Sequence, residues 1–164
     1  MSRGVDGAVG AERTGFRLAA YAVCVEEGRV LLTLHASGAW TLPGGRVEHA
    51  EDPFDAVVRE TAEETGAEAV VERLLGVDSR VIPAADARAG VEHHNVGLFY
   101  RVRVTGGPLR PEPNGETVAV AWTPVAEVAG LRRSSLVDVG LALARTAPPT
   151  GHVAPAPVGG LVQH

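Results

Sequence analysis

The segment DPFDAVVRETAEETG, residues 52–66, carries a complete set of helix signals. Asp52 can accept hydrogen bonds from the first free backbone amides of a helix, and Pro53 is favoured in the first turn because its nitrogen carries no proton. Gly66 suits the residue after the last turn, where the left-handed conformation is common. These signals predict a helix from Pro53 to Thr65.

Glutamates crowd one flank of this predicted helix. Glu60, Glu63 and Glu64 follow the i, i+3, i+4 spacing, so their side chains are neighbours. Each like-charged pair destabilises a helix by about 0.2–0.5 kcal/mol, and Arg59 can offset only part of the repulsion. A solvated acidic surface would explain the glutamates taken alone. A divalent cation would also explain them, because carboxylates and substrate phosphates together commonly hold Mg²⁺.

A second stripe of the same helix is suited to packing on a sheet. At about 100° per residue, the side chains of this stripe fall on one side, next to the glutamates. We therefore expect the stripe to face the sheet. Its members are Phe54, Val58, Thr61 and Thr65, with Val57 at the edge.

The segments on either side of the helix alternate between strand-forming runs and loops rich in glycine and proline. Gly28 suits a hairpin turn between the first two strands. Thr123 and Pro124 predict the start of another helix, and Ser134 or Ser135 the cap of the last one. The order of strands, helix, strands and helices predicts an α/β fold in which helices pack on a mixed sheet. The predicted strands lie within residues 16–26, 29–35, 68–83, 93–104 and 117–124.

Length and composition restrict the domain organisation and the partners. The 164 residues fit one domain. We expect this domain at residues 15–146, between a flexible arm at 1–14 and a disordered tail rich in proline, alanine and glycine at 147–164. The formal net charge of −5 argues against a nucleic-acid polymer as partner. A single cysteine, Cys24, and the lack of a long apolar run predict a cytoplasmic protein that does not span a membrane.

The wider segment GRVEHAEDPFDAVVRETAEETGA, residues 45–67, resembles the Nudix box. That pattern has a glycine, five residues, a glutamate, seven residues and then Arg-Glu-aliphatic-x-Glu-Glu-x-Gly-aliphatic. Thr61 and Ala67 stand where larger apolar residues are usual, whereas all the fixed positions match. The matching residues are Gly45, Glu51, Arg59, Glu60, Glu63, Glu64 and Gly66.

The resemblance implies the Nudix α/β/α sandwich, with a mixed β-sheet between helices. It also implies a hydrolase that requires Mg²⁺ or Mn²⁺. Such an enzyme cleaves the phosphoanhydride of a nucleoside diphosphate linked to another moiety, by attack of water on phosphorus. The implied partner is therefore a small nucleotide derivative, and by analogy two copies of the chain can form a homodimer.

Roles follow from the same resemblance. The carboxylates of Glu60, Glu63 and Glu64 would bind the metal together with the carbonyl group of Gly45. Arg59 would orient these glutamates through salt bridges, and it completes the catalytic set. The remaining structural positions of the box are Gly66 and Glu51, which would hold the loop.

The proton acceptor for the attacking water is left open. It is either a glutamate of the box or one from a later loop, and this chain offers Glu112 and Glu116 in the segment PEPNGE. Glu116 stands six residues before Trp122, a spacing common in relatives, and we prefer it as the catalytic loop residue. Solubility of the loop would also explain both carboxylates.

The substrate is equally open. Trp122, His94 and Arg46 are candidate substrate contacts, although core packing would also explain Trp122. His93 and His94 are adjacent in a predicted strand and point to opposite faces, so we expect one at the surface and the other at the cleft. Pro83 resembles a proline of the ADP-ribose-hydrolysing branch, and nucleoside triphosphates fit as well.

Two other functions compete with hydrolysis. A non-catalytic nucleotide or ADP-ribose sensor could use the same fold, although such proteins usually lose glutamates of the box. An interaction module with an acidic helix would leave the spacing of the glycines and the arginine unexplained. Metal-dependent release of phosphate products distinguishes the hydrolase from both.

Overall fold

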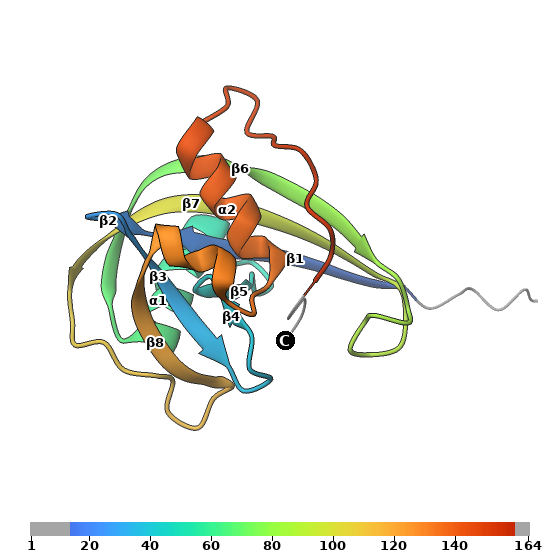
Figure 1. The fold of residues 1–164 in the computed structure, drawn as a ribbon. Coiled ribbons are helices and arrows are strands. Elements are labelled where there is room, and N and C mark those ends of the chain that lie inside the picture. Colours follow the sequence, from blue (N-terminus) through green and yellow to red (C-terminus); the bar gives the residue numbers. More distant parts are fainter. Residues whose placement is uncertain (1–13, 160–164) are drawn as a thin grey trace, which may run out of the picture.

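The computed structural model describes residues 14–159, and a mixed four-stranded sheet lies at its centre (Figure 1). The strand order is β5-β1-β7-β6. β1 pairs with β7 in parallel, whereas the β1–β5 and β6–β7 pairs are antiparallel. The four strands are β1 (Gly15–Val23), β5 (Gly44–Arg46), β6 (Glu68–Ile82) and β7 (His93–Gly106).

A second, smaller sheet packs beside the first. Its strand β3 pairs with β2, β4 and β8, and all three pairings are antiparallel. The strand bounds are β2 (Val25–Glu26), β3 (Arg29–His35), β4 (Trp40–Thr41) and β8 (Thr117–Pro124).

Helices α1 (Pro53–Thr65) and α2 (Ser135–Thr146) cover opposite faces of the central sheet (Figure 1). The alternation of β1 explains both interfaces: Ala20 belongs to the apolar cluster under α1, and Tyr21 to the cluster under α2. This is the predicted α/β/α fold with a mixed sheet between helices. Within the described residues, no helix combines the length and apolar character that a membrane span needs.

The predicted start and end of α1 are confirmed. The Asp52 carboxylate accepts a hydrogen bond from the Phe54 amide at 2.8 Å, and Gly66 ends the helix with φ of 75°. Ser134 caps α2 as predicted. The predicted helix start at Thr123 is wrong, because Thr123 belongs to β8 and a 3₁₀ helix, η1 (Val125–Gly130), begins after Pro124.

The predicted packing stripe of α1 is only partly correct. Phe54 is 48% exposed, and its ring lies edge-on to Tyr100 of β7. The helix is turned so that the small Ala56 and Val57 side chains meet the sheet. This rotation allows a close approach of helix and sheet, and it also buries Glu64. The buried side chains of α1 are Ala56, Val57, Thr61, Glu64 and Thr65.

The chain after α2 forms neither helix nor strand up to residue 159, yet it packs on the domain. The Val77 amide of β6 donates to the Gly151 carbonyl oxygen at 2.9 Å, and Val153 and Ala156 pack against the core cluster under α2. The proline-rich composition excludes regular structure here, but an extended chain still covers the free edge of β6. The predicted disordered tail is thus held against the sheet over residues 147–159. Residues 1–13 of the predicted arm at 1–14 and the last residues, 160–164, lie outside the described part.

Gly76→Ala tests this packing. A Cβ atom at position 76 would overlap the Gly151 carbonyl oxygen, so the substitution must push the C-terminal segment off β6. We expect a loss of about 1–3 kcal/mol in the free energy of unfolding, measured by thermal or urea denaturation. Gly130→Ala is the matched control, because a Cβ atom there would meet nothing within 4 Å. Equal stability of both variants would show that the segment is not packed as described.

Candidate active site

A cavity of about 360 Å³ lies beside α1, where the helix meets β1, β5 and the loop before β8. Most of the predicted site residues line it. It also receives three charged side chains that we did not predict as ligands or substrate contacts from the sequence, namely Arg17, Glu48 and Glu112. The predicted residues that line it are Gly45, Arg46, Arg59, Glu60, Glu63, Glu64 and Glu116.

Arg59 is the centre of the hydrogen-bond network at this cavity. Its Nε and Nη2 atoms donate to the two carboxylate oxygens of Glu51 at 2.8 and 2.9 Å. Its Nη1 atom donates to Glu60 and Glu63 at 3.1 and 3.2 Å. The hydrogen bonds from Arg59 and from the Glu48 amide lower the pKa of Glu51 to about 2, so Glu51 stays ionised as the partner of Arg59.

Glu64 is the most deeply buried of the three box glutamates, at 8% exposure. Its Oε2 atom accepts a hydrogen bond from the Gly44 amide at 3.0 Å. Burial raises the pKa of Glu64 well above its ordinary value, and the nearby charges of Glu60 and Glu112 raise it further. Burial also raises the pKa of Glu60, against the opposing effect of Arg59. The cavity therefore concentrates negative charge that the protein compensates only in part.

Gly45 leaves space for one of these carboxylates. A Cβ atom on residue 45 would lie 2.9 Å from the Glu60 Oε1 atom, so any side chain there would displace Glu60. The backbone of β5 and the carboxylates of α1 thus approach closely enough to act together. Oxygen donors of this kind suit a hard divalent cation.

The possible metal ligands of the cavity are not gathered around one point. In residues 14–159, no three carboxylate, imidazole or thiol groups already converge as a metal-binding group. Glu60 and Glu63 point instead to Arg59. A small number of protein ligands agrees with the way proteins hold Mg²⁺, because this ion keeps several waters and takes substrate phosphates as further ligands.

The two loop glutamates have different surroundings. Glu116 accepts hydrogen bonds from His35 Nε2 and from Arg88, both at 3.1 Å, and these contacts lower its pKa to about 2. Glu112, in contrast, acts electrostatically on Glu60 and Glu64 and raises the pKa of both. We preferred Glu116 from its spacing to Trp122, but Glu112 lines the same cavity and its charge acts on two glutamates of the box.

Two of the three candidate substrate contacts lie away from the cavity. Trp122 packs under the guanidinium group of Arg29, 5.9 Å from the ring centroid. The Nε2 atom of His94 and the hydroxyl group of Ser79 share a hydrogen bond of 2.8 Å, and His94 is not among the residues that line the cavity. The register of β7 places His93, not His94, on the face that carries Arg17. Only Arg46 of the three lines the site.

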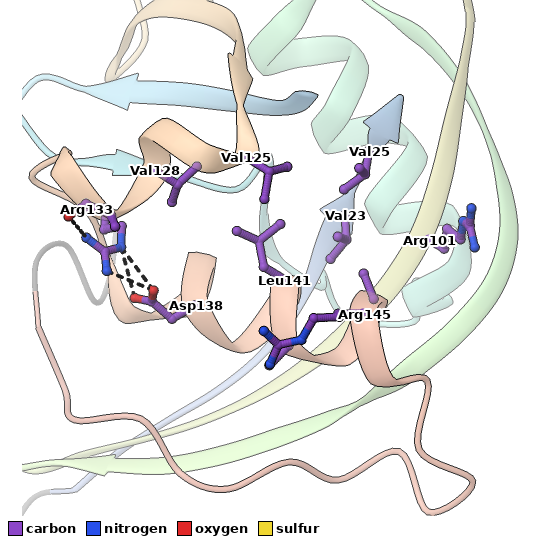
Figure 2. A pocket seen from close by; sticks show the side chains of 12 residues that line it. Val23, Val25, Arg101, Val125, Val128, Arg133, Asp138, Leu141 and Arg145 are labelled. Atoms are coloured by element: carbon purple, nitrogen blue, oxygen red, sulfur yellow. Dashed lines mark hydrogen bonds and ion pairs between the residues drawn. The ribbon is translucent and has the colours of Figure 1, made fainter. Parts of the chain in front are cut away.

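A larger cavity of about 530 Å³ lies elsewhere, between α2, η1 and the end of β1. Valine, leucine and alanine residues form most of its lining, and Figure 2 shows Asp138 engaged by Arg133, at 2.9 Å. None of the carboxylates of α1 reaches this cavity. We therefore assign the chemistry to the smaller, charged cavity.

The sequence and the fold match one family. The sequence model of the NUDIX domain matches residues 15–139. A MutT-like protein of Streptomyces ambofaciens is 36% identical over 121 residues, which cover 69% of this chain and 71% of that protein. A solved NUDIX hydrolase from Nitrosomonas europaea has a TM-score of 0.70 at 18% identity, over 82% of this chain and 92% of that chain. The chain belongs to the Nudix family.

A further relative matches a shorter part of the chain at higher identity. An ADP-ribose pyrophosphatase of Methanocaldococcus jannaschii is 42% identical over 73 residues, which cover 44% of this chain. The match spans 40% of that protein, less than half of its length.

Glu64→Gln should stabilise the protein in metal-free buffer. Above pH about 4.5 the unfolded chain releases the Glu64 proton, whereas the folded chain keeps it up to the raised pKa. The stability of the wild type therefore falls as pH rises through that window, and glutamine removes this loss. We expect an advantage of about 1–3 kcal/mol in urea denaturation that grows from pH 4.5 upward. Glu127→Gln, at an exposed position, is the control, and a pH-independent difference would contradict the prediction.

Proposed function

We propose that this Nudix-type pyrophosphohydrolase cleaves the phosphoanhydride of a nucleoside diphosphate linked to another moiety, by attack of water on phosphorus. One observation carries the proposal: three carboxylates of α1 share a cavity with the backbone of Gly45 and remain only partly neutralised by Arg59. Such a cavity binds cations. A diphosphate is the substrate type that brings a cation and needs its charge neutralised.

Nudix hydrolases use divalent metal ions, and the residues of this cavity fit one. Glu60, Glu63, Glu64 and the Gly45 carbonyl group would hold Mg²⁺ or Mn²⁺. When bound, the ion neutralises the diphosphate and lowers the pKa of a coordinated water molecule.

The protein's own groups supply orientation and proton transfer. Arg59 keeps the carboxylates of Glu60 and Glu63 at the cavity, and Glu51 keeps Arg59 in place through two hydrogen bonds. A carboxylate near the attacking water accepts its proton. We place this role on Glu112 or a box glutamate ahead of Glu116, because Glu116 is already engaged by His35 and Arg88.

The substrate class follows from the family and from one relative. The pyrophosphatase of M. jannaschii acts on ADP-ribose by its name, and this chain is 42% identical to it over 73 residues. We propose ADP-ribose-like compounds and nucleoside or deoxynucleoside triphosphates as substrates. The partner is then a small molecule, and a cytoplasmic location and a homodimer remain predictions.

Glu63→Gln tests the role of the carboxylates. Glu63 is half exposed, with 49% of its side-chain surface accessible, so the substitution should leave the fold intact. We expect the rate of diphosphate hydrolysis to fall by roughly two to four orders of magnitude, since the change removes a ligand charge next to the reacting phosphate. Release of phosphate products is measured with Mg²⁺ and with Mn²⁺, and Glu127→Gln serves as the control.

The substrates for this assay form a panel: ADP-ribose, nucleoside and deoxynucleoside triphosphates, dinucleotide polyphosphates, NADH, coenzyme A and nucleotide sugars. Near wild-type turnover in Glu63→Gln would refute the metal-ligand role. If the wild type hydrolyses no compound of the panel with either ion, the sensor function replaces the hydrolase.

Glu112→Gln and Glu116→Gln distinguish the two loop carboxylates. We expect kcat to fall by about 10²–10⁴ in Glu112→Gln if that carboxylate accepts the proton, and the fall in Glu116→Gln to be smaller. The pH profile of kcat should lose its acidic limb only in the variant that lacks the base. The reverse order of effects would restore Glu116 as the preferred base.

A further inference from the structure

A row of buried polar side chains crosses the central sheet on one face. Arg17 of β1 lies directly opposite Asn95 of β7, and Asn95 lies opposite Arg80 of β6. The three residues are 4%, 1% and 8% exposed. Two arginines thus stand in one row at similar depth, and their surroundings can be compared.

The two arginines differ in how the protein neutralises them. The Nε atom of Arg80 donates to the Asp78 carboxylate at 2.8 Å, and its Nη1 atom donates to the Ser135 hydroxyl group. Arg17 has no ion pair within 4 Å among residues 14–159, and its Nε atom has no hydrogen-bond partner there. A buried charge without a counter-charge is costly. The fold supplies a direct ionic partner for Arg80, whereas Arg17 acts on the Glu64 carboxylate only from beyond ion-pair distance.

Arg17 lines the candidate active site, whereas Arg80 does not. Arg46 of β5 lines the same cavity and projects from the same face, since it lies opposite Ala19, two residues after Arg17. Next to the pair, burial and the positive charges of Arg17 and Arg46 lower the pKa of His93. The cavity therefore carries a positive region on β1 and β5, and the charge of Arg17 also acts on Glu64 of α1.

Two further buried atoms beside Arg17 are unsatisfied. His93 Nε2 and Asn95 Oδ1 have no partner among the described residues, and His93 lies opposite Gly15, two residues before Arg17. Together with Arg17 Nε, they make up the buried unsatisfied side-chain atoms found in residues 14–159. Such atoms are rare in native proteins, and three of them on neighbouring residues need an explanation, which a bound polar group would supply.

We propose that Arg17, assisted by Arg46, binds the phosphate group of the substrate that the carboxylate cluster does not hold, and thereby makes the site selective for diphosphates over monophosphates. The inference rests on the proposed function for the identity of the ligand. A guanidinium group recognises two phosphate oxygens at once, and a neutral His93 can add one further hydrogen bond. An anion at this position supplies the ion pair and the Nε partner that Arg17 lacks.

The test compares the binding of two probes, α,β-methylene-ADP and AMP, by isothermal titration calorimetry at one saturating Mg²⁺ concentration. The methylene bridge blocks cleavage between the two phosphates, so affinity is read without turnover. We expect the wild type to prefer the diphosphate, and Arg17→Gln to bind it about 10–100-fold more weakly while its affinity for AMP changes little. Arg17→Lys, which keeps the charge but not the planar fork, should retain part of the preference.

Arg80→Gln is the matched control, because it removes an equally buried arginine of the same row. We expect it to lower Tm through the loss of the Asp78 and Ser135 contacts and to leave the ratio of the two affinities unchanged. Arg17→Gln should keep or raise Tm, because it removes a charge that the protein does not neutralise. Failure of Arg17→Gln to fold, an unchanged preference, or an equal loss for both probes would each overturn the proposal.

The outcome of the hydrolase assay and the outcome of this binding test are independent of each other. If no diphosphate is cleaved but Arg17→Gln still loses the preference, the proposed reaction is wrong and the phosphate site stands. If the wild type cleaves diphosphates but Arg17→Gln binds both probes as the wild type does, the reaction stands and the phosphate site is wrong.

Discussion

The double hydrogen bond between Arg59 and Glu51 is the contact on which the site depends. It ties the loop before α1 to the second turn of that helix. The other donors of the same guanidinium group reach Glu60, Glu63 and the carbonyl oxygen of Arg46 at the end of β5. One planar side chain thus joins the loop, the helix and the sheet, which the point charge of a lysine could not do.

Helix α1, which carries the carboxylates, also buries two polar threonine side chains. Threonines occupy buried positions of α1, and their hydroxyl groups donate to backbone carbonyl groups one turn earlier: Thr61 to Val57 at 2.7 Å and Thr65 to Thr61 at 2.6 Å. This satisfies the hydroxyl groups inside the core and explains why Thr61 can stand where the family prefers a larger apolar residue. Burial of Glu64 nevertheless opposes folding. The buried Glu64 carboxylate thus lowers the stability of the folded protein at the place where the function needs a charged group.

Local signals were sufficient to predict α1, because its cap, its proline and its terminal glycine act within a few residues. The box spacing likewise placed the carboxylates and Arg59 correctly in one cavity. The exposure of Phe54 was missed, because the rotation of a helix on a sheet depends on which side chains fit beneath it. Arg17 was missed as a part of the site because β1 meets α1 only in the folded chain, and no motif of the sequence marks its position. Glu112 was a candidate proton acceptor from the sequence, but spacing alone favoured Glu116 over it.

The cavity favours a cation in one part and an anion in another, so a ligand with one sign of charge cannot satisfy both parts. Its carboxylates, on α1, favour a cation, and its arginines, on β1 and β5, favour an anion. A metal ion alone leaves the Arg17 Nε atom without a partner, and a free phosphate brings no cation for the carboxylates of α1. A metal–diphosphate complex meets both conditions in one binding event. Each component should then strengthen the binding of the other, because a coupling free energy between two sites is reciprocal. Selectivity for diphosphates would thus arise from the charge arrangement of the empty protein.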